Sequence, residues 1–319
     1  MKLVLLSDLH LMWDNPVARL DVVRETQLRK MEYVMEWVSR EGAVLLQAGD
    51  FFDTPRSWFL AEQWIRFFDR WKGKDQGSLP LAVFGQHDTY MYSEATRHAT
   101  ILGALEAAGL VRILGEEPEV IPTGPGRPVE THVYGASYGQ PVPEPDDADA
   151  LNILVIHAMI VDARAWPGQE EFWYAPKFLA DHPGYDLILC GDLHRRFHFT
   201  SAYRHIVNAG CLTRHTADKY NFSHRPGFYV YDTESRAVWL EEVPHEPAER
   251  VLSRAHLDAA ARTERLLDDF IEAMERVEAG EEQDVSFFDN LVAVARESAL
   301  SQKTKDLLAE VIDEEVKWK

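Results

Sequence analysis

The chain has 319 residues, of which 46% are hydrophobic and 27% charged, and its formal net charge is −20. This composition is that of a globular protein, and it excludes disordered, collagen-like and coiled-coil fibre classes. The acidic charge also excludes a protein that coats nucleic acid by bulk attraction. The sequence has no run of ~18 apolar residues, no signal-peptide pattern and only two cysteines. We therefore expect a cytoplasmic protein that is not associated with a membrane.

β-rich runs alternate with helical patterns through the first part of the chain, which predicts an α/β layered domain. Helical periodicity predicts two helices that stop at glycines, at 18–39 and 96–108. A further helix through Trp58 would take Asp53 or Thr54 as its N-cap. The predicted strands are 2–6, 43–48, 81–84, 130–134, 152–156, 185–190, 203–207, 227–232 and 236–242.

After Pro247 the pattern changes to helices only, which places a domain boundary near residue 245. We therefore expect one domain at 1–245 and an acidic helical extension at 246–319. The extension is too short to bury all of its apolar stripes within itself. We expect it to dock on a partner or to support oligomerisation, with packing on its own chain as the alternative. The expected contact face is Leu307, Leu308, Val311 and Ile312.

Five predicted strands end abruptly in Asp or His. These residues are Asp8 and His10, Asp50, His87 and Asp88, His157, and Asp192 and His194. Because ligands of α/β sheets gather at the carboxyl ends of the strands, the side chains should converge on one point. Mixed carboxylates and imidazoles suit manganese, iron or zinc. Two such metals ~3.5–4 Å apart can clamp a phosphate and activate a water for in-line attack.

The ordered series also resembles the calcineurin-like metallophosphoesterase superfamily, whose pattern is Asp-x-His, Gly-Asp, Gly-Asn-His-Asp, His and Gly-His-x-His. Within that superfamily the chain is similar to the SbcD-like DNA repair nuclease subunits. The residues that carry this closer likeness are 7–11, 48–53 and 208–214. The resemblance covers roughly residues 1–240. It implies a four-layer αββα metallophosphoesterase sandwich with a C-terminal helical extension.

The resemblance implies two divalent metal ions, most simply manganese, with magnesium or iron as alternatives. The implied ligands are Asp8, His10 and His194 for the first metal, Asp50 as the bridge, and Gln86, His157 and Asp192 for the second metal. It also implies that His87 protonates the leaving 3′ oxygen or stabilises charge on the phosphoryl group. Asp88 would orient His87, as carboxylates commonly do for imidazoles.

Two positions depart from the family pattern. Gln86 stands where Asn is usual, and Asp192 stands where the first His of Gly-His-x-His is usual. A carboxylate in place of an imidazole adds negative charge and shifts the preference toward manganese or magnesium. Because both changes fall on the second metal, we expect that metal to be held more weakly.

The resulting hypothesis is a metal-dependent DNA phosphodiesterase in which a metal-activated hydroxide attacks the phosphodiester. The resemblance implies an exonuclease with single-strand endonuclease activity, working as a homodimer with an SbcC-type ATPase in DNA break processing. Two alternatives stay open. One is a phosphoesterase acting on small substrates such as cyclic nucleotides, which the acidic charge favours. The other is a degenerate scaffold that binds a partner without catalysis.

Weaker features complete the sequence-based expectations. Trp13, Tyr90 and Tyr92 could stack on bases, with ordinary packing as the alternative. Basic residues beside the motifs could hold phosphates or serve as ion-pair partners, namely Arg195, Arg196 and Arg214. Surface positions are expected for the histidines without motif context, which are His98, His132, His182, His205, His215, His224 and His245.

Overall fold

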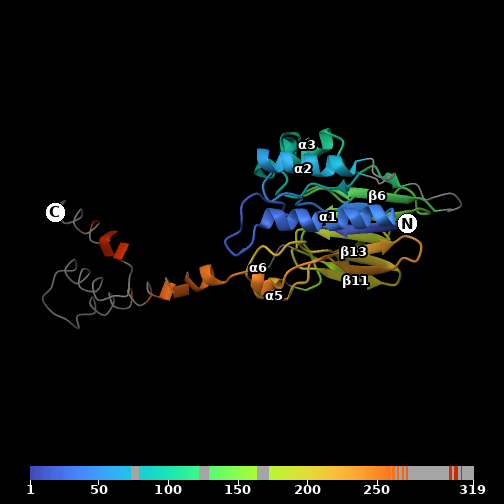
Figure 1. The fold of residues 1–319 in the computed structure, drawn as a ribbon. Helices are drawn as coiled ribbons and strands as arrows, with labels where there is room; N and C mark the ends of the chain where they lie inside the picture. The colour runs from blue at the N-terminus through green and yellow to red at the C-terminus, as the bar shows by residue number, and fades with distance from the viewer. Residues whose placement is uncertain are drawn as a thin grey trace, which may run out of the picture. The chain divides into compact units, whose positions relative to one another are not determined.

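Two six-stranded sheets form the centre of the protein in the computed structural model, which describes residues 1–72, 79–121, 129–163, 172–259 and isolated residues between 261 and 310. The chain divides into one unit at Met1–Leu252 and another at Ser253–Lys319. Both sheets belong to the first unit. Figure 1 shows the strands and the helices that surround them.

The first sheet has the strand order β14-β13-β1-β2-β3-β4. Its members are β1 (Lys2–Leu6), β2 (Val44–Gln47), β3 (Leu81–Ala82), β4 (Arg112–Ile113), β13 (Gly227–Asp232) and β14 (Val238–Glu242). Strands β1 to β4 run parallel, and β13 is antiparallel to β1. The carboxyl ends of β1, β2 and β3 therefore share one edge.

The second sheet has the order β11-β12-β10-β7-β6-β5. Its members are β5 (Glu119–Ile121), β6 (Thr131–Ala136), β7 (Leu151–His157), β10 (Leu187–Gly191), β11 (Phe197–Ser201) and β12 (Arg204–Asn208). Strands β6, β7, β10 and β12 are parallel. A separate two-stranded sheet pairs β8 (Ile160–Val161) with β9 (Trp173–Tyr174).

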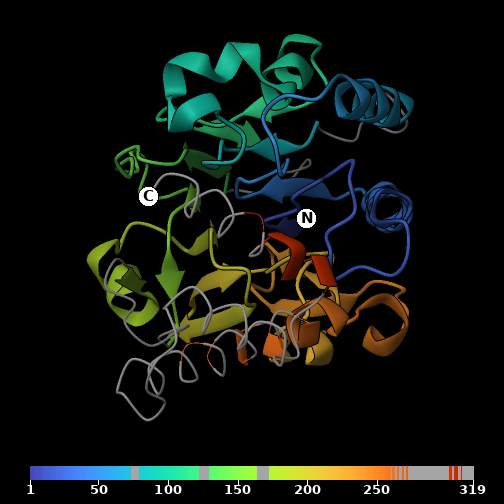
Figure 2. The same ribbon diagram turned by 90° about the vertical axis from the view of Figure 1, so that its left-hand side faces the viewer.

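The helices complete the layers. They are α1 (Val23–Glu41), α2 (Trp58–Trp71), α3 (Ile101–Ala107), α4 (Ala175–Asp181), α5 (Lys219–Ser223) and α6 (Ala248–Val251), with 3-10 turns η1 (Tyr90–Tyr92) and η2 (Glu94–Ala99). Figure 2 shows α1 and α2 (blue) on one side of the strands and the yellow-green α4 segment on the other.

Alternation of side chains along the strands explains this layering. On β1, Leu3 and Leu5 lie in the core between the two sheets, which they share with Val155 of the second sheet. The intervening residues Val4 and Leu6 lie in the core that the first sheet forms with α1, α2 and α3. The outer face of the second sheet packs on α4 through another core. The mixed α/β sandwich expected from the sequence is confirmed.

The helices begin later than expected: α1 begins at Val23 and not at residue 18, and α3 begins at Ile101, after the 3-10 turn η2, and not at residue 96. The helix that stops at Gly42 is confirmed as α1. The N-cap of α2, however, is Ser57, whose hydroxyl accepts from the Leu60 amide, and neither Asp53 nor Thr54 takes that position. The carboxylate of Asp53 lies instead 3.4 Å from Nδ1 of His10. Asp53 therefore belongs to the group of polar residues at the strand ends and does not cap the helix.

The expectations for the C-terminal extension fall largely on residues outside the described part of the chain. Leu307 belongs to a short helical stretch and is exposed. Leu308, Val311 and Ile312 lie outside the described residues. Among the helices that the structure describes, none has the length and hydropathy needed to cross a membrane.

Candidate metal centre

The polar residues that follow the strands sit in unusual backbone conformations. Asp8, His10, Asp50 and Asp192 all have positive φ, between 42° and 87°. Positive φ is uncommon for residues other than glycine and clusters at functional sites, where the surrounding structure holds it in place. Here the His10 amide donates to the Asp50 carbonyl, and the Asp192 amide donates to Oδ1 of Asp8. The loops after β1, β2 and β10 therefore fix one another.

Close approach of the backbone at two glycines makes room for the cluster. A Cβ atom on Gly49, whose φ is +78°, would lie 2.3 Å from Nδ1 of His157. A Cβ atom on Gly85 would lie 2.1 Å from Oδ1 of Asp50. Since real Cβ atoms do not come this close to other heavy atoms, only glycine lets the three strand ends meet.

The residues expected at the first metal converge. Nε2 of His10 lies 3.0 Å from Nε2 of His194. One ligand atom from each of Asp8, His10 and His194 lies within 4.8 Å of the others. Asp8 and His10 are buried, whereas His194 is exposed. These three side chains form a half-open set that a divalent ion can reach from solvent.

Asp50 lies between this set and His157. Its Oδ2 atom is 3.5 Å from Nε2 of His10 and 3.5 Å from Nε2 of His157. Asp8, Asp50 and His157 form a further group with ligand atoms within 4.8 Å of one another. The position of Asp50 between two groups is the one expected of a bridging carboxylate.

Two orphaned atoms test whether a metal fits here. Oδ2 of Asp8 and Oδ2 of Asp50 are buried, and neither has a hydrogen-bond partner. Buried carboxylate oxygens without partners are costly, and coordination of a cation removes that cost. Nδ1 of His157 lies 2.7 Å from the Ala48 carbonyl, which fixes the ring and directs Nε2 at the cluster. The donor atoms, and the contact with the Ala48 carbonyl that orients His157, fit the binding of divalent metal ions.

The electrostatics also favour a cation. Burial raises the pKa of Asp8 to about 7. Burial acts the same way on Asp50, but His157 and His10 outweigh it and hold that pKa below its usual range. Burial lowers the pKa of His157, yet the carboxylates of Asp50, Asp8 and Asp192 together outweigh burial and raise the pKa to about 10. The cluster therefore holds a proton on His157 that a metal ion would displace.

The two residues that depart from the family pattern contact each other. Nε2 of Gln86 donates to Oδ1 of Asp192 at 2.7 Å, while Oε1 of Gln86 lies 2.6 Å from Nε2 of His157. The longer amide side chain thus spans from the carboxylate to the imidazole. Their expected role as second-metal ligands stays a prediction, because both side chains are engaged with each other in this arrangement.

His87 lies at the rim of the cluster, half-buried, with its ring edge-on to His10 at 4.9 Å between centroids. The expected support from Asp88 is wrong. Nδ1 of His87 lies 3.1 Å from the Asp53 carbonyl. The Asp88 carboxylate instead accepts three backbone amides, from Phe51, Phe52 and Gly85. Asp88 therefore fixes the backbone around the cluster rather than the imidazole.

Two residues of the site do not follow from the sequence pattern. Asp53 approaches both His10 and His87, and these three form a third group of possible ligands. Its signal was present, because it ends the segment 48–53 that carries the family likeness. His215 lies edge-on to His10 at 5.8 Å, and its Nε2 is buried without a hydrogen-bond partner. Its expected surface position is wrong.

Other expectations are corrected by burial. His132, His205 and His224 are buried, not at the surface. Arg214 is buried as well and donates to the backbone carbonyls of His224 and Glu246. Its guanidinium therefore serves a different part of the molecule from the cluster.

The fold and the convergent donor set define a metal-dependent phosphoester hydrolase. A model of the calcineurin-like phosphoesterase family matches residues 1–196. The chain therefore belongs to the calcineurin-like phosphoesterase family. No curated protein sequence matches it.

Solved structures with a similar fold share little sequence with the chain. A protein of Thermus thermophilus is 13% identical, with a TM-score of 0.45, over 76% of this chain and 98% of that one. A putative 5′-nucleotidase from Staphylococcus aureus is 12% identical, with a TM-score of 0.46, over 77% of this chain and 54% of that one. An archaeal phosphodiesterase is 13% identical, with a TM-score of 0.39, over 76% of this chain and 100% of that one.

Proposed function

We propose that the protein is a metal-dependent phosphodiesterase that acts on DNA. The observation that carries the proposal is the meeting of Asp8, Asp50 and three histidines around two buried carboxylate oxygens that have no partner. Divalent ions bound there would neutralise the phosphoryl group and activate a water. This arrangement supports hydrolysis of a phosphoester.

The residues of the chain have distinct tasks in this proposal. Asp8, His10 and His194 would hold a metal ion at the more open position, and Asp50 would serve both this position and the one beside His157. The hydrogen on Nδ1 of His87 would be donated to the Asp53 carbonyl, which leaves Nε2 without that contact. When the ring is protonated at both nitrogens, Nε2 can give its proton to the leaving oxygen as the ester bond breaks, and His87 is left as the neutral imidazole with its proton on Nδ1.

A surface of exposed large side chains beside the cluster favours a polymeric substrate. The loop that carries His87 continues directly into η1, where Tyr90, Met91 and Tyr92 are all exposed. The guanidinium of Arg56 lies 4.0 Å from the centre of the Tyr90 ring. Exposed aromatic side chains provide platforms for stacked bases of a single strand.

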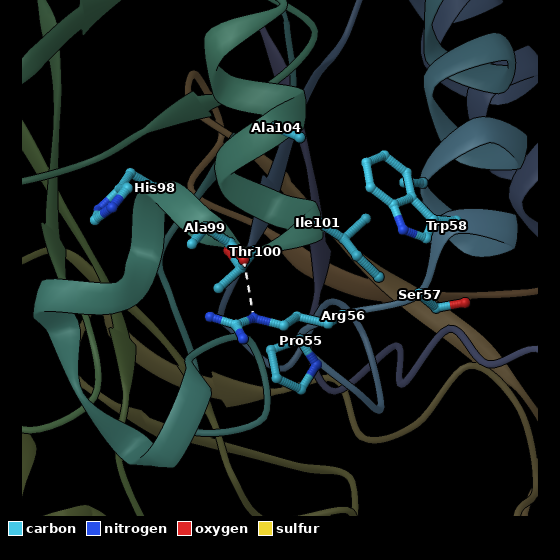
Figure 3. A pocket seen from close by; sticks show the side chains of 10 residues that line it. Pro55, Arg56, Ser57, Trp58, His98, Ala99, Thr100, Ile101 and Ala104 are labelled. Carbon is cyan, nitrogen blue, oxygen red and sulfur yellow. Dashed lines mark hydrogen bonds between the residues drawn. The ribbon is translucent and has the colours of Figure 1, made fainter.

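A pocket of about 420 Å³ extends this surface between the start of α2 and the start of α3. Figure 3 shows its walls, with Trp58 on one side, Ile101 and Ala104 on the other, and Arg56 donating to the Ala99 carbonyl. Trp58 is 90% exposed. The pocket begins two residues after Asp53 in the sequence, and the proposal places a bound single strand along it.

The alternative is a phosphoesterase for small substrates. The net charge of −20 favours it, because an acidic surface repels a nucleic-acid backbone. We propose DNA because the aromatic surface and the likeness to SbcD-like nucleases both point to it. That likeness also supports an SbcC-type ATPase as partner and a homodimer as the working form.

Turnover of three substrates separates these functions. The purified protein with manganese should degrade linear DNA and hydrolyse bis-p-nitrophenyl phosphate, while releasing little phosphate from a mononucleotide. Hydrolysis of the small ester and the mononucleotide without DNA cleavage would favour the small-substrate enzyme. Inactivity toward all three with manganese, magnesium and iron would contradict a hydrolase and favour the scaffold.

A further inference from the structure

A second cavity, of about 350 Å³, lies between the first half of α1 and the loop after β14. Positive side chains dominate its wall. Its charged lining comprises the cations Arg19, Arg29, Lys30 and Arg214 and the carboxylates Asp21 and Glu246. None of the residues of the metal cluster lines it. A wall with more cations than carboxylates stands out in a chain whose net charge is −20.

Three of these cations are buried, and few carboxylates lie close enough to balance their charges. Arg19, Lys30 and Arg214 are only 7%, 5% and 5% exposed. Of the three, Arg19 forms an ion pair, with Asp21 at 2.6 Å. Within the described part of the chain, no carboxylate lies within ion-pair distance of Lys30 or Arg214. Because burying an unpaired charge is costly, a cation in such a place usually has an anionic partner.

Hydrogen bonds to the backbone do not remove the charge. Nζ of Lys30 donates to the Leu212 carbonyl at 2.6 Å. Arg214 donates to the carbonyls of His224 and Glu246. These neutral acceptors satisfy N–H groups and fix the loop after β12, but they leave the positive charges uncompensated. Nε of Arg19 is buried and has no partner at all.

The charges also act on one another. Burial and the nearby charges of Arg214 and Arg19 hold the pKa of Lys30 well below its usual range, against the weaker effect of Asp21. The carboxylate of Glu246, which also lines the cavity, lies 3.4 Å from the guanidinium of Arg250. An anion bound in the cavity would face the guanidinium of Arg214, which has no carboxylate partner among the described residues, and would favour the protonated form of Lys30.

We propose that this cavity binds a phosphate group, either as free phosphate or as the terminal phosphate of a nucleotide. The four cations and two carboxylates of the lining leave an excess of two positive charges, which matches a phosphate dianion. The volume lies at the lower end of the range for small-molecule sites. The site is separate from the metal cluster and does not depend on the proposed nuclease activity.

Isothermal titration of the full-length, metal-loaded protein tests the proposal, with inorganic phosphate and AMP as separate titrants. Arg29→Gln removes a cavity cation whose side chain is 68% exposed, so folding should be preserved. Lys30→Met removes the buried charge at similar volume. Arg40→Gln is the matched control, because Arg40 lies on the same helix, is 62% exposed and does not line the cavity. His194→Ala reports binding at the metal centre.

We expect each cavity substitution to weaken phosphate binding about tenfold, the effect of one lost charge-assisted hydrogen bond. Arg40→Gln and His194→Ala should leave this binding event within twofold of the parent. If AMP binds more tightly than phosphate with the same pattern among the variants, the ligand is a nucleotide; equal affinities assign free phosphate. The proposal would be overturned if His194→Ala abolished binding while the cavity variants retained it. It would also be overturned if neither phosphate nor AMP bound to the protein.

Discussion

The two oxygens of Asp50 have different neighbours, which indicates how one residue can serve two metal positions. Oδ1 accepts the His87 amide at 2.8 Å and so fixes the loop after β3. Oδ2 has no hydrogen-bond partner and lies equally far from Nε2 of His10 and of His157. One oxygen therefore holds the backbone while the other is left to ligands. His157 belongs to the ligand group, whereas His87 lies at the rim.

This distinction predicts different effects for two histidine substitutions. His87→Ala should keep the metal content and reduce the rate by about 10²–10⁴, because it removes a proton donor without removing a ligand. His157→Ala should lose one metal, since it removes the imidazole beside Asp50. Metal content by elemental analysis and kcat on bis-p-nitrophenyl phosphate measure both. Loss of metal in His87→Ala would show that His87 is a ligand.

We expect His224, which is not one of the candidate metal ligands, to make the stability of the fold depend on pH. Its Nε2 lies 2.8 Å from the Cys211 carbonyl, and its buried Nδ1 has no partner. Burial lowers the pKa of His224 to about 4. Because the unfolded chain binds this proton near pH 6.5, the neutral ring stabilises the fold fully above pH 6.5, and that contribution is lost as the pH falls toward 4.

His224→Gln removes this titration and keeps a side-chain donor. Between pH 7.5 and pH 5, the free energy of unfolding of the parent should fall by about 2 kcal/mol more than that of the variant. Urea denaturation at the two pH values measures the difference. Equal losses in both proteins would mean that His224 titrates normally in the folded state.

The sequence predicts the residues at the strand ends better than it predicts the contacts between the loops that follow the strands. Asp8, Asp50 and His157 follow hydrophobic strands, and parallel strands bring their carboxyl ends together, so the cluster could be predicted. The contact of Gln86 with Asp192 could not, because it depends on how two loops 106 residues apart approach each other. The same holds for Asp53, which local rules assign to a helix cap.

The buried histidines were missed for a related reason. His205 lies on β12, where its Nε2 reaches the carbonyl of Arg236 in the turn between two strands of the other sheet. Nothing near His205 in the sequence indicates that contact. Periodicity predicts which strands are buried, but a polar residue within a strand finds its partner only when the sheets pack.

The exposed aromatic surface beside the cluster gives a prediction for substrate binding. Tyr90→Ala should raise KM for single-stranded DNA about tenfold, the loss of one base-stacking contact. KM for bis-p-nitrophenyl phosphate should not change, because that ester does not reach the surface. Tyr203→Ala is the matched control. Tyr203 is 60% exposed and directly precedes β12, at the amino ends of the parallel strands, whereas the cluster lies at their carboxyl ends. Equal effects of both substitutions on DNA would contradict the stacking role.

At the scale of the whole molecule, charge and the C-terminal extension limit which partners the protein can bind. A net charge of −20 disfavours DNA at long range, so binding has to come from local features such as the metal centre and the aromatic surface. The extension adds an acidic segment with apolar stripes, and Leu307 in it is exposed. We propose that this segment docks on a partner or on a second copy.

Deletion of residues 300–319 tests that proposal. The shortened protein should lose self-association or partner binding, as measured by light scattering, while its thermal unfolding temperature stays within a few degrees of the parent. An unchanged mass together with a clear fall in thermal stability would show that the segment packs within its own chain.

Counting bound metal ions tests whether the strand-end cluster is a metal centre. After soaking in manganese and removal of free metal, elemental analysis should find between one and two ions per chain, the second being the weaker. Asp50→Asn should reduce both, because Asp50 lies between the two ligand groups. A metal content near zero in the parent protein would show that the cluster is not a metal centre, and an unchanged content in Asp50→Asn would show that Asp50 is not a ligand.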